Sequence, residues 1–231
     1  MIIIHKIEEL FRRAKTQRID SPQEIVEHNS KEKSNSDDTF SFIKKIENIE
    51  LTNEQKLSEV LKTIGLDEAL IRKLVNMKNI DINKLRKNLY LLNQYNYSYI
   101  QLSIIIANNT SIITMSPERL GNILGDLLSY FKEPEIVKEI VYSDSRVVSG
   151  AILYRIKEVE KIFEKFEVEL QENKCILIEN PHILFMDDER LEKSLSIIKE
   201  YTQAYDSFMN LIKVDPIVIG IVDSSVLTDY M

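Results

Sequence analysis

Apolar residues recur along this chain at an interval of 35 residues. The longest series that keeps this interval comprises Ile71, Ile106, Val141, Ile176 and Leu211. Two further apolar series keep it as well: Leu89, Leu124 and Val159, and then Leu92, Leu127, Ile162 and Ile197. Apolar self-similarity at such a period is typical of a helical solenoid, in which each short unit buries its inner face only against its neighbours. The pattern therefore predicts an all-α solenoid of about five repeats, a kind of protein that usually works by binding.

Each predicted repeat divides into two amphipathic helices around a short turn. First helices are expected at 67–77, 98–109, 134–143, 169–179 and 204–213. Second helices are expected at 82–95, 117–131, 150–166, 188–202 and, truncated, 223–229. Asp81, Ser116 and Asp187 suit the N-cap position of second helices, and Pro117 suits a first helical turn, where its missing N–H has no partner to lose.

A short apolar piece separates the two helices of a repeat and follows the same interval. Its copies lie at 111–113, 146–148, 181–184 and 216–219. In the last two copies proline ends the first helix. We expect these pieces to be more extended than the helices and to bring their apolar side chains back into the core.

Residues 1–50 carry no copy of the repeat. One side of residues 1–19 is apolar and its end is basic, which predicts an amphipathic helix. Residues 20–40 are mostly polar and predict a flexible linker, so the repeat domain is expected over 41–231. We expect the N-terminal helix to cap the solenoid; the alternative is an arm that binds a partner or nucleic acid through its basic end.

The composition agrees with a helical fold. Of 231 residues, 44% are apolar, and 5 Gly and 5 Pro leave little turn material for a many-stranded β fold. The single cysteine, Cys175, cannot form an internal disulfide, and its place beside Ile176 predicts a buried side chain. No apolar run reaches the roughly 18–20 residues that span a bilayer, and the opening apolar stretch is too short for a signal peptide. A soluble cytoplasmic protein is the expectation.

A resemblance to a known family appears in the helix ends and turns. Residues 56–71 contain a leucine-rich helix that ends in Ile64-Gly65-Leu66 and is followed by an acidic helix start. This resembles the repeat of the mTERF (mitochondrial transcription termination factor) family, whose helix ends in Leu-Gly-Leu or a variant. Pro-His-Ile-Leu at 181–184 and Pro-Ile-Val-Ile at 216–219 resemble that family's Pro-x-Leu-Leu element. The similarity covers residues 51–231, and most of its motifs are core-packing positions.

The resemblance implies a curved solenoid in which each repeat has two α-helices and a short 3₁₀ turn. Many members of the mTERF family bind double-stranded nucleic acid along a basic concave groove and act in organellar gene expression. The resemblance therefore implies a role in transcription or another step of gene expression. This chain departs from the family pattern because it is acidic overall, has no recognisable transit peptide, and lacks proline in the turns after residues 77, 110 and 145.

The first functional hypothesis is binding of nucleic acid, either DNA or RNA, double-stranded as the resemblance implies. The formal net charge is −7, yet residues 51–100 carry eight Lys and Arg against five Asp and Glu. The side chains that would neutralise phosphates are Arg72, Lys73, Lys84, Arg86, Lys87 and Arg119.

Four tyrosines near these basic residues could add stacking on bases: Tyr90, Tyr95, Tyr97 and Tyr99. A role in packing is favoured for them, because Tyr95 matches Tyr130 at the repeat interval and is expected to close a core layer.

The alternative hypothesis is a solenoid that binds a protein partner. Residues 151–231 carry sixteen Asp and Glu against nine Lys and Arg, and such a surface would select a basic partner. The side chains that would carry that selection are Glu158, Glu160, Glu164, Glu167, Glu169, Asp187, Asp188 and Glu189. A monomer is favoured, with self-association through the apolar end around 214–221 as the other hypothesis.

An enzyme is the least favoured class. His5, His28 and His182 are far apart, and no His/Cys metal-ligand spacing, glycine-rich phosphate loop or nucleophile elbow is present. We expect neither catalytic residues nor a metal or other cofactor. His182 is expected to be a partly buried structural residue in a turn.

Overall fold

The computed structural model describes residues 52–77, 80–202, 205–214 and 216–222. These residues lie in one compact unit, Ser36–Met231. Every regular element in this described part is a helix, which confirms the predicted all-α class there. The helix predicted over 1–19, the linker over 20–40 and the truncated helix over 223–229 lie outside the described residues.

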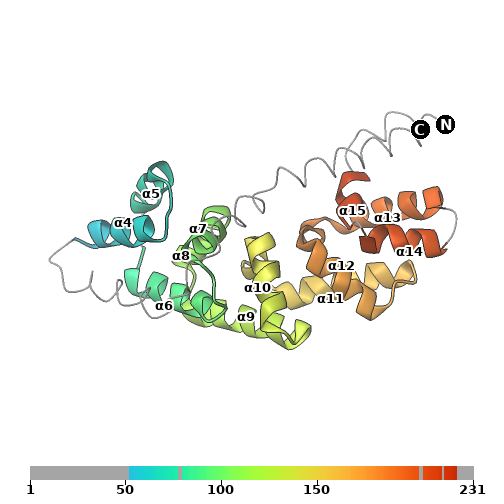
Figure 1. Cartoon of the computed structure of the whole chain (residues 1–231), viewed down its shortest axis with the longest axis horizontal. Helices are drawn as coiled ribbons and strands as arrows, with labels where there is room; N and C mark the ends of the chain where they lie inside the picture. Colours follow the sequence, from blue (N-terminus) through green and yellow to red (C-terminus); the bar gives the residue numbers. More distant parts are fainter. Residues whose placement is uncertain (1–51, 78–79, 203–204, 215, 223–231) are drawn as a thin grey trace, which may run out of the picture. The chain divides into compact units, whose positions relative to one another are not determined.

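The helix boundaries follow the predicted ones to within two residues. The first helices of the predicted repeats are α5 (Glu68–Val75), α7 (Tyr99–Asn108), α10 (Pro134–Ser143), α12 (Leu170–Glu179) and α14 (Tyr205–Val214). The second helices are α6 (Ile82–Asn93), α9 (Pro117–Phe131), α11 (Ile152–Lys165) and α13 (Asp188–Thr202). An additional helix, α4 (Asn53–Thr63), precedes them (Figure 1). We call each first helix and the second helix that follows it a helix pair.

The predicted N-caps explain where the second helices begin. The side chains of Asp81, Ser116 and Asp187 each accept a hydrogen bond from a backbone N–H of the first helical turn, at 2.9, 3.3 and 2.9 Å. Pro117 opens α9 as predicted. At the same position before α11 stands Ala151, which has no side-chain oxygen and makes no cap hydrogen bond.

A short helical turn follows each first helix from α7 onward, so the prediction of a more extended piece is wrong for the two α-helical copies and holds only to the extent of a 3₁₀ helix for the other two. The turns are α8 (Ser111–Thr114), η2 (Ser145–Val148), η3 (Pro181–Phe185) and α15 (Ile217–Val222), and η2 and η3 are 3₁₀ helices. Each turn buries two adjacent apolar side chains: Ile112 and Ile113, Val147 and Val148, Ile183 and Leu184, and Val218 and Ile219. Adjacent side chains point to opposite faces of an extended chain but lie only about 100° apart around an α-helix and about 120° apart around a 3₁₀ helix. A helical turn can therefore bury both.

The buried positions keep the 35-residue interval through α12 and then shift. The members of the longest series up to α12 are buried: Ile71, Ile106, Val141 and Ile176. In α14, however, Leu211 is only half-buried and its neighbour Ile212 is buried. In α13, Ile197 is likewise half-buried beside the buried Ile198.

One extra residue between α10 and α12 accounts for the shift. The C-cap residues of α7, α10 and α12 are Asn109, Asp144 and Asn180, each directly after the last helical residue. Their backbone angles are closely similar, and they are spaced by 35 and then 36 residues. Later core positions therefore move by one residue relative to a constant interval.

Cys175, predicted to be buried, and His182, predicted to be partly buried, are both exposed. Cys175 is exposed because the extra residue places Ile176 and Leu177 in the buried stripe of α12 and turns Cys175 to the opposite side. The His182 side chain is 64% exposed, because its neighbours in the 3₁₀ turn η3 occupy the inward positions instead.

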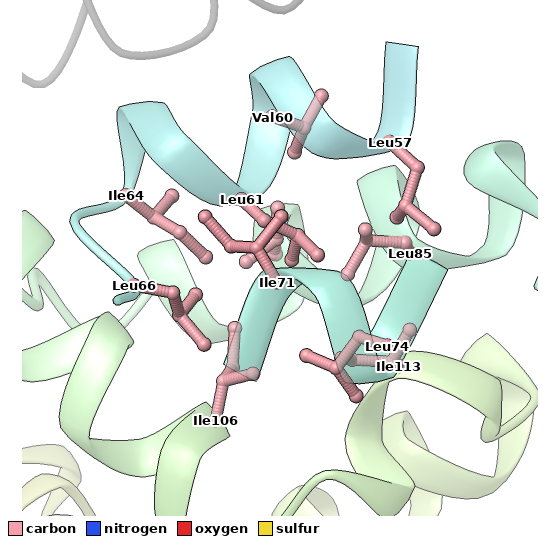
Figure 2. Close-up of a cluster of buried hydrophobic side chains, with 11 residues drawn as sticks. Leu57, Val60, Leu61, Ile64, Leu66, Ile71, Leu74, Leu85, Ile106 and Ile113 are labelled. Carbon is pink, nitrogen blue, oxygen red and sulfur yellow. The ribbon is translucent and has the colours of Figure 1, made fainter. Parts of the chain in front are cut away.

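An apolar cluster joins α4, α5 and α6 to the next helix pair. Figure 2 shows Leu61 of α4 beside Ile71 of α5, with Leu85 of α6 close to them. Ile106 of α7 and Ile113 of α8 belong to the same cluster. Truncating a buried Leu or Ile to Ala typically costs about 2–5 kcal/mol, so these contacts hold the described N-terminal helices to their neighbours.

Contacts between successive helix pairs are regular. First helices contact first helices, in the order α7, α10, α12 and α14. Second helices contact second helices, in the order α6, α9, α11 and α13. The residues that end α7 and α12 add equivalent hydrogen bonds: Asn109 Nδ2 donates to Ser145 O at 2.7 Å, and Asn180 Nδ2 donates to Pro216 O at 3.0 Å.

The apolar residues of α15 bear on the self-association hypothesis. Val218 and Ile219 are buried, and α15 packs against α13 and α14 within the same compact unit. These two side chains therefore already have an internal partner.

Candidate nucleic-acid interface

The six basic residues predicted to contact phosphates come from three helices. Arg72 and Lys73 lie in the last turn of α5, and Arg119 lies in the first turn of α9. The other three belong to α6: Lys84, Arg86 and Lys87.

Helix α6 separates its three basic side chains into two groups. Its buried stripe contains Leu85 and Leu89. With 3.6 residues per turn, Lys84 and Lys87 lie about 60° apart on the solvent side of the helix. Arg86 lies about 160° from Lys84, so the buried stripe lies between Arg86 and Lys84. Lys84 and Lys87 are exposed and Arg86 is half-buried. Two of the three side chains therefore share one exposed face.

The basic residues of α5 differ in how they are paired. Arg72 Nε lies 3.8 Å from Glu68 Oε2, one helical turn earlier, and the Arg72 side chain is 80% exposed. Exposed pairs of this kind contribute at most about 1 kcal/mol, so the guanidinium can exchange this partner for a phosphate. Lys73 is exposed and, like Lys84 and Lys87, makes no ion pair with a residue in the described part of the chain.

Arg119 contacts the turn of the next helix pair. Its Nη2 donates a hydrogen bond to Ser149 O at 3.0 Å. Arg155, near the start of α11, donates from Nε to Leu184 O at 2.9 Å and is ion-paired with Asp188. In both helices an arginine therefore bonds to backbone at the turn of the following pair, which gives Arg119 a structural role that its sequence position did not reveal.

The tyrosines divide between packing and exposure. Tyr97 is buried, and its hydroxyl donates to Lys138 O at 2.9 Å. Burial raises the pKa of Tyr97, and it also raises the pKa of the half-buried Tyr95, whose ring centroid lies 6.5 Å from that of Tyr97. Tyr90 is different, because it is 55% exposed. Tyr99 is 36% exposed.

The helical pattern of α6 contained the signal for the exposed tyrosine. Tyr90 follows the buried Leu89 directly and lies about 100° further around the helix. It lies outside the buried stripe that the apolar spacing of α6 defines. The favoured packing role therefore fits Tyr95 and Tyr97 and does not fit the exposed Tyr90 and Tyr99.

The acidic residues of the later helices make internal contacts. Glu160 Oε1 accepts a hydrogen bond from the Tyr130 hydroxyl at 2.5 Å, and burial together with Glu160 raises the pKa of Tyr130. Glu158 pairs with Lys161 at 2.9 Å. Further acids are engaged at helix starts: Asp187 caps α13, Asp188 pairs with Arg155, and Glu169 belongs to the capping box of α12. These contacts reduce the charge that the acidic surface offers to a basic partner.

The comparisons with known proteins assign no family. No protein-family model matches this chain, and no curated protein matches it significantly. No helix of the described residues has the length and apolar character needed to cross a bilayer. In the same residues no three His, Cys, Asp or Glu side chains gather in a way that could hold a metal ion. The functional interpretation therefore rests on the placement of individual side chains.

Proposed function

We propose that this chain is a non-enzymatic helical-repeat protein of the cytoplasm that binds nucleic acid through phosphate contacts and acts in transcription or another step of gene expression. The proposal treats the successive helix pairs as repeats of a curved, mTERF-like solenoid. Support comes from the order in which first helices contact first helices and second helices contact second helices, and from the recurring buried positions.

The arrangement of Lys73, Lys84 and Lys87 carries the functional part of the proposal. These lysines are exposed, lie on two consecutive helices and have no acidic partner in the described part of the chain. A phosphate backbone that pairs with such groups releases condensed counterions, which favours binding even when the whole protein is acidic. Arg72 can join them, because its pair with Glu68 lies on the surface and contributes little energy that a phosphate would have to replace.

Fluorescence anisotropy with labelled random duplex DNA and with single-stranded RNA tests this proposal. We expect binding at about 50 mM salt that weakens several-fold or more at about 200 mM salt. The double variant Lys84→Ala/Lys87→Ala should weaken binding of both probes and reduce the slope of log K against log salt by about 2.

A matched double variant controls for the loss of two positive charges. Lys157 on α11 and Lys193 on α13 are also exposed lysines, and Lys157→Ala/Lys193→Ala changes the net charge equally outside the basic helices. This control should leave the slope unchanged. Failure of the wild-type chain to bind either probe at micromolar concentration would overturn the proposal.

A protein partner is the second candidate, favoured by two exposed apolar side chains. Ile100 at the start of α7 is 66% exposed and Leu170 at the start of α12 is 57% exposed. They lie at the starts of two first helices, Ile100 as the second residue of α7 and Leu170 as the first residue of α12. If the nucleic-acid probes do not bind, Ile100→Ser/Leu170→Ser becomes the variant with which to test protein ligands.

A further inference from the structure

The exposed face of α6 combines positive charge with an aromatic ring. Lys84, Lys87 and Tyr90 follow one another at intervals of three residues. Successive members lie about 60° apart around the helix, and the set rises about 9 Å along its axis. Tyr90 is 55% exposed, and both lysines are exposed. We call these three residues the α6 stripe.

The chemistry of the α6 stripe distinguishes between forms of nucleic acid. Lysines pair with phosphates of any strand and carry no preference for single strands or duplexes. An exposed tyrosine ring stacks on the face of a base, and that face is covered in a duplex by the neighbouring base pairs. A ring placed beside phosphate-binding lysines therefore adds affinity only for nucleotides that are unpaired.

We propose that the α6 stripe binds single-stranded nucleic acid, with Lys84 and Lys87 on consecutive phosphates and Tyr90 stacked on a base. The inference rests on the proposed function and adds to it the strand form of the ligand. The charge of the stripe is complementary to a polyanion, since neither lysine has an acidic partner in the described part of the chain. Tyr90 supplies the contact that a duplex cannot use.

Substitution of Tyr90 is the first test, with a labelled oligothymidylate and a labelled duplex of matched length as probes. Tyr90→Ala should lower affinity for the single strand about five-fold or more and leave affinity for the duplex unchanged. Tyr90→Phe keeps the ring and should retain wild-type affinity. Tyr154 on α11 is 67% exposed, so Tyr154→Ala is the matched control and should change neither affinity.

A fluorescent reporter gives an independent readout, because the chain contains no tryptophan. In Tyr90→Trp the single indole should be quenched as the oligothymidylate is added, with a midpoint that matches the anisotropy titration. In Tyr154→Trp the emission should not change over the same range. Quenching in both variants would indicate non-specific association and overturn the assignment of Tyr90.

The outcomes separate this inference from the proposed function. If wild-type protein binds neither probe, the proposed function fails and the inference fails with it. If wild-type protein binds and Lys84→Ala/Lys87→Ala weakens binding, but Tyr90→Ala binds the single strand as wild type does, then only the stacking role of Tyr90 is overturned.

Discussion

Asp144 Oδ2 lies 2.7 Å from His182 Nδ1, and this contact links the end of α10 to the turn η3 of the next helix pair. The Asp144 carboxylate also accepts hydrogen bonds from the Arg146 guanidinium, at 2.9 Å from Nε to Oδ1 and 2.6 Å from Nη2 to Oδ2. Asn109 and Asn180 hold the equivalent position and donate to a carbonyl of the next turn instead. A carboxylate cannot donate in this way, so Asp144 reaches the next pair through His182.

The stability of this junction should depend on pH. Burial alone would raise the pKa of Asp144, but hydrogen bonds from His182 and Arg146 together lower it well below its ordinary value. A carboxyl whose pKa is depressed on folding stabilises the native state above its unfolded pKa, near 4, and loses that contribution as pH falls. Asp144→Ala should therefore destabilise the protein by about 1–3 kcal/mol at pH 7. The difference in free energy of unfolding from wild type should begin to narrow below about pH 5 and should keep narrowing below pH 3.

Urea unfolding at several pH values measures this difference. Asp126 is an exposed aspartate on α9, so Asp126→Ala removes the same charge without the buried contacts and should show no such pH dependence. Asp144→Asn should be milder than Asp144→Ala, because an amide can donate to the turn as Asn109 and Asn180 do. A constant gap between Asp144→Ala and wild type across the pH range would contradict this account.

Asn88 ties α6 to the following turn from inside the core. Its side chain is fully buried, and Nδ2 donates to Ile112 O at 2.7 Å and to Met115 O at 2.8 Å. Asn88→Ala would leave two buried carbonyls without this donor, and we expect a loss of about 1–3 kcal/mol in the free energy of unfolding. Asn83→Ala, an exposed change in the same helix, serves as control and should cost less than about 0.5 kcal/mol in thermal or urea unfolding. Equal effects of the two variants would contradict the role of Asn88.

The sequence predicted the helices well because their ends are chemically marked. Asp81, Ser116 and Asp187 cap three second helices, and the apolar stripes between such caps have the period of an α-helix. The sequence pattern did not reveal the extra residue before Asn180, because the buried positions there are adjacent apolar pairs such as Ile176 and Leu177. The positions that a constant interval of 35 residues selects in α12 and α14 are therefore still apolar, although the true equivalents lie one residue away.

Side-chain partners were harder to predict than core positions. Arg119 has the positive charge and the N–H donors that suit a phosphate. Its hydrogen bond to Ser149 O, however, depends on how two helix pairs pack. The exposure of Tyr90 could be read from the stripe of α6, whereas the burial of Tyr97 could not, since its hydroxyl reaches Lys138, 41 residues further along the chain. Contacts of this kind follow from tertiary packing and leave no local pattern.

The missing N-cap of α11 offers a stabilising substitution. Ala151 stands where Asp81, Ser116 and Asp187 stand in the other pairs, and α11 has no acidic residue in its first turn. Ala151→Asp should accept hydrogen bonds from the first-turn N–H groups and interact favourably with the helix dipole, and we expect a gain of about 1 kcal/mol.

Differential scanning calorimetry measures this gain as a rise in Tm. Ala151→Leu lacks the oxygen and should bring no such rise, while Asp187→Ala, the reverse change in α13, should lower the free energy of unfolding by about 1 kcal/mol. A Tm of Ala151→Asp at or below that of wild type would show that this helix start cannot adopt the capped geometry.

Arg119 tests how structural and binding roles divide among the basic residues. Because its Nη2 donates to Ser149 O, Arg119→Ala should lower the free energy of unfolding by about 0.5–1.5 kcal/mol. If this bond is its main role, the slope of log K against log salt for nucleic-acid binding should stay at the wild-type value, whereas Lys84→Ala should lower it by about 1. The two quantities are measured on the same preparations by urea unfolding and by anisotropy. A slope that falls by about 1 in Arg119→Ala would mean that the guanidinium contacts a phosphate as well, and the interface would then extend from α6 to the start of α9.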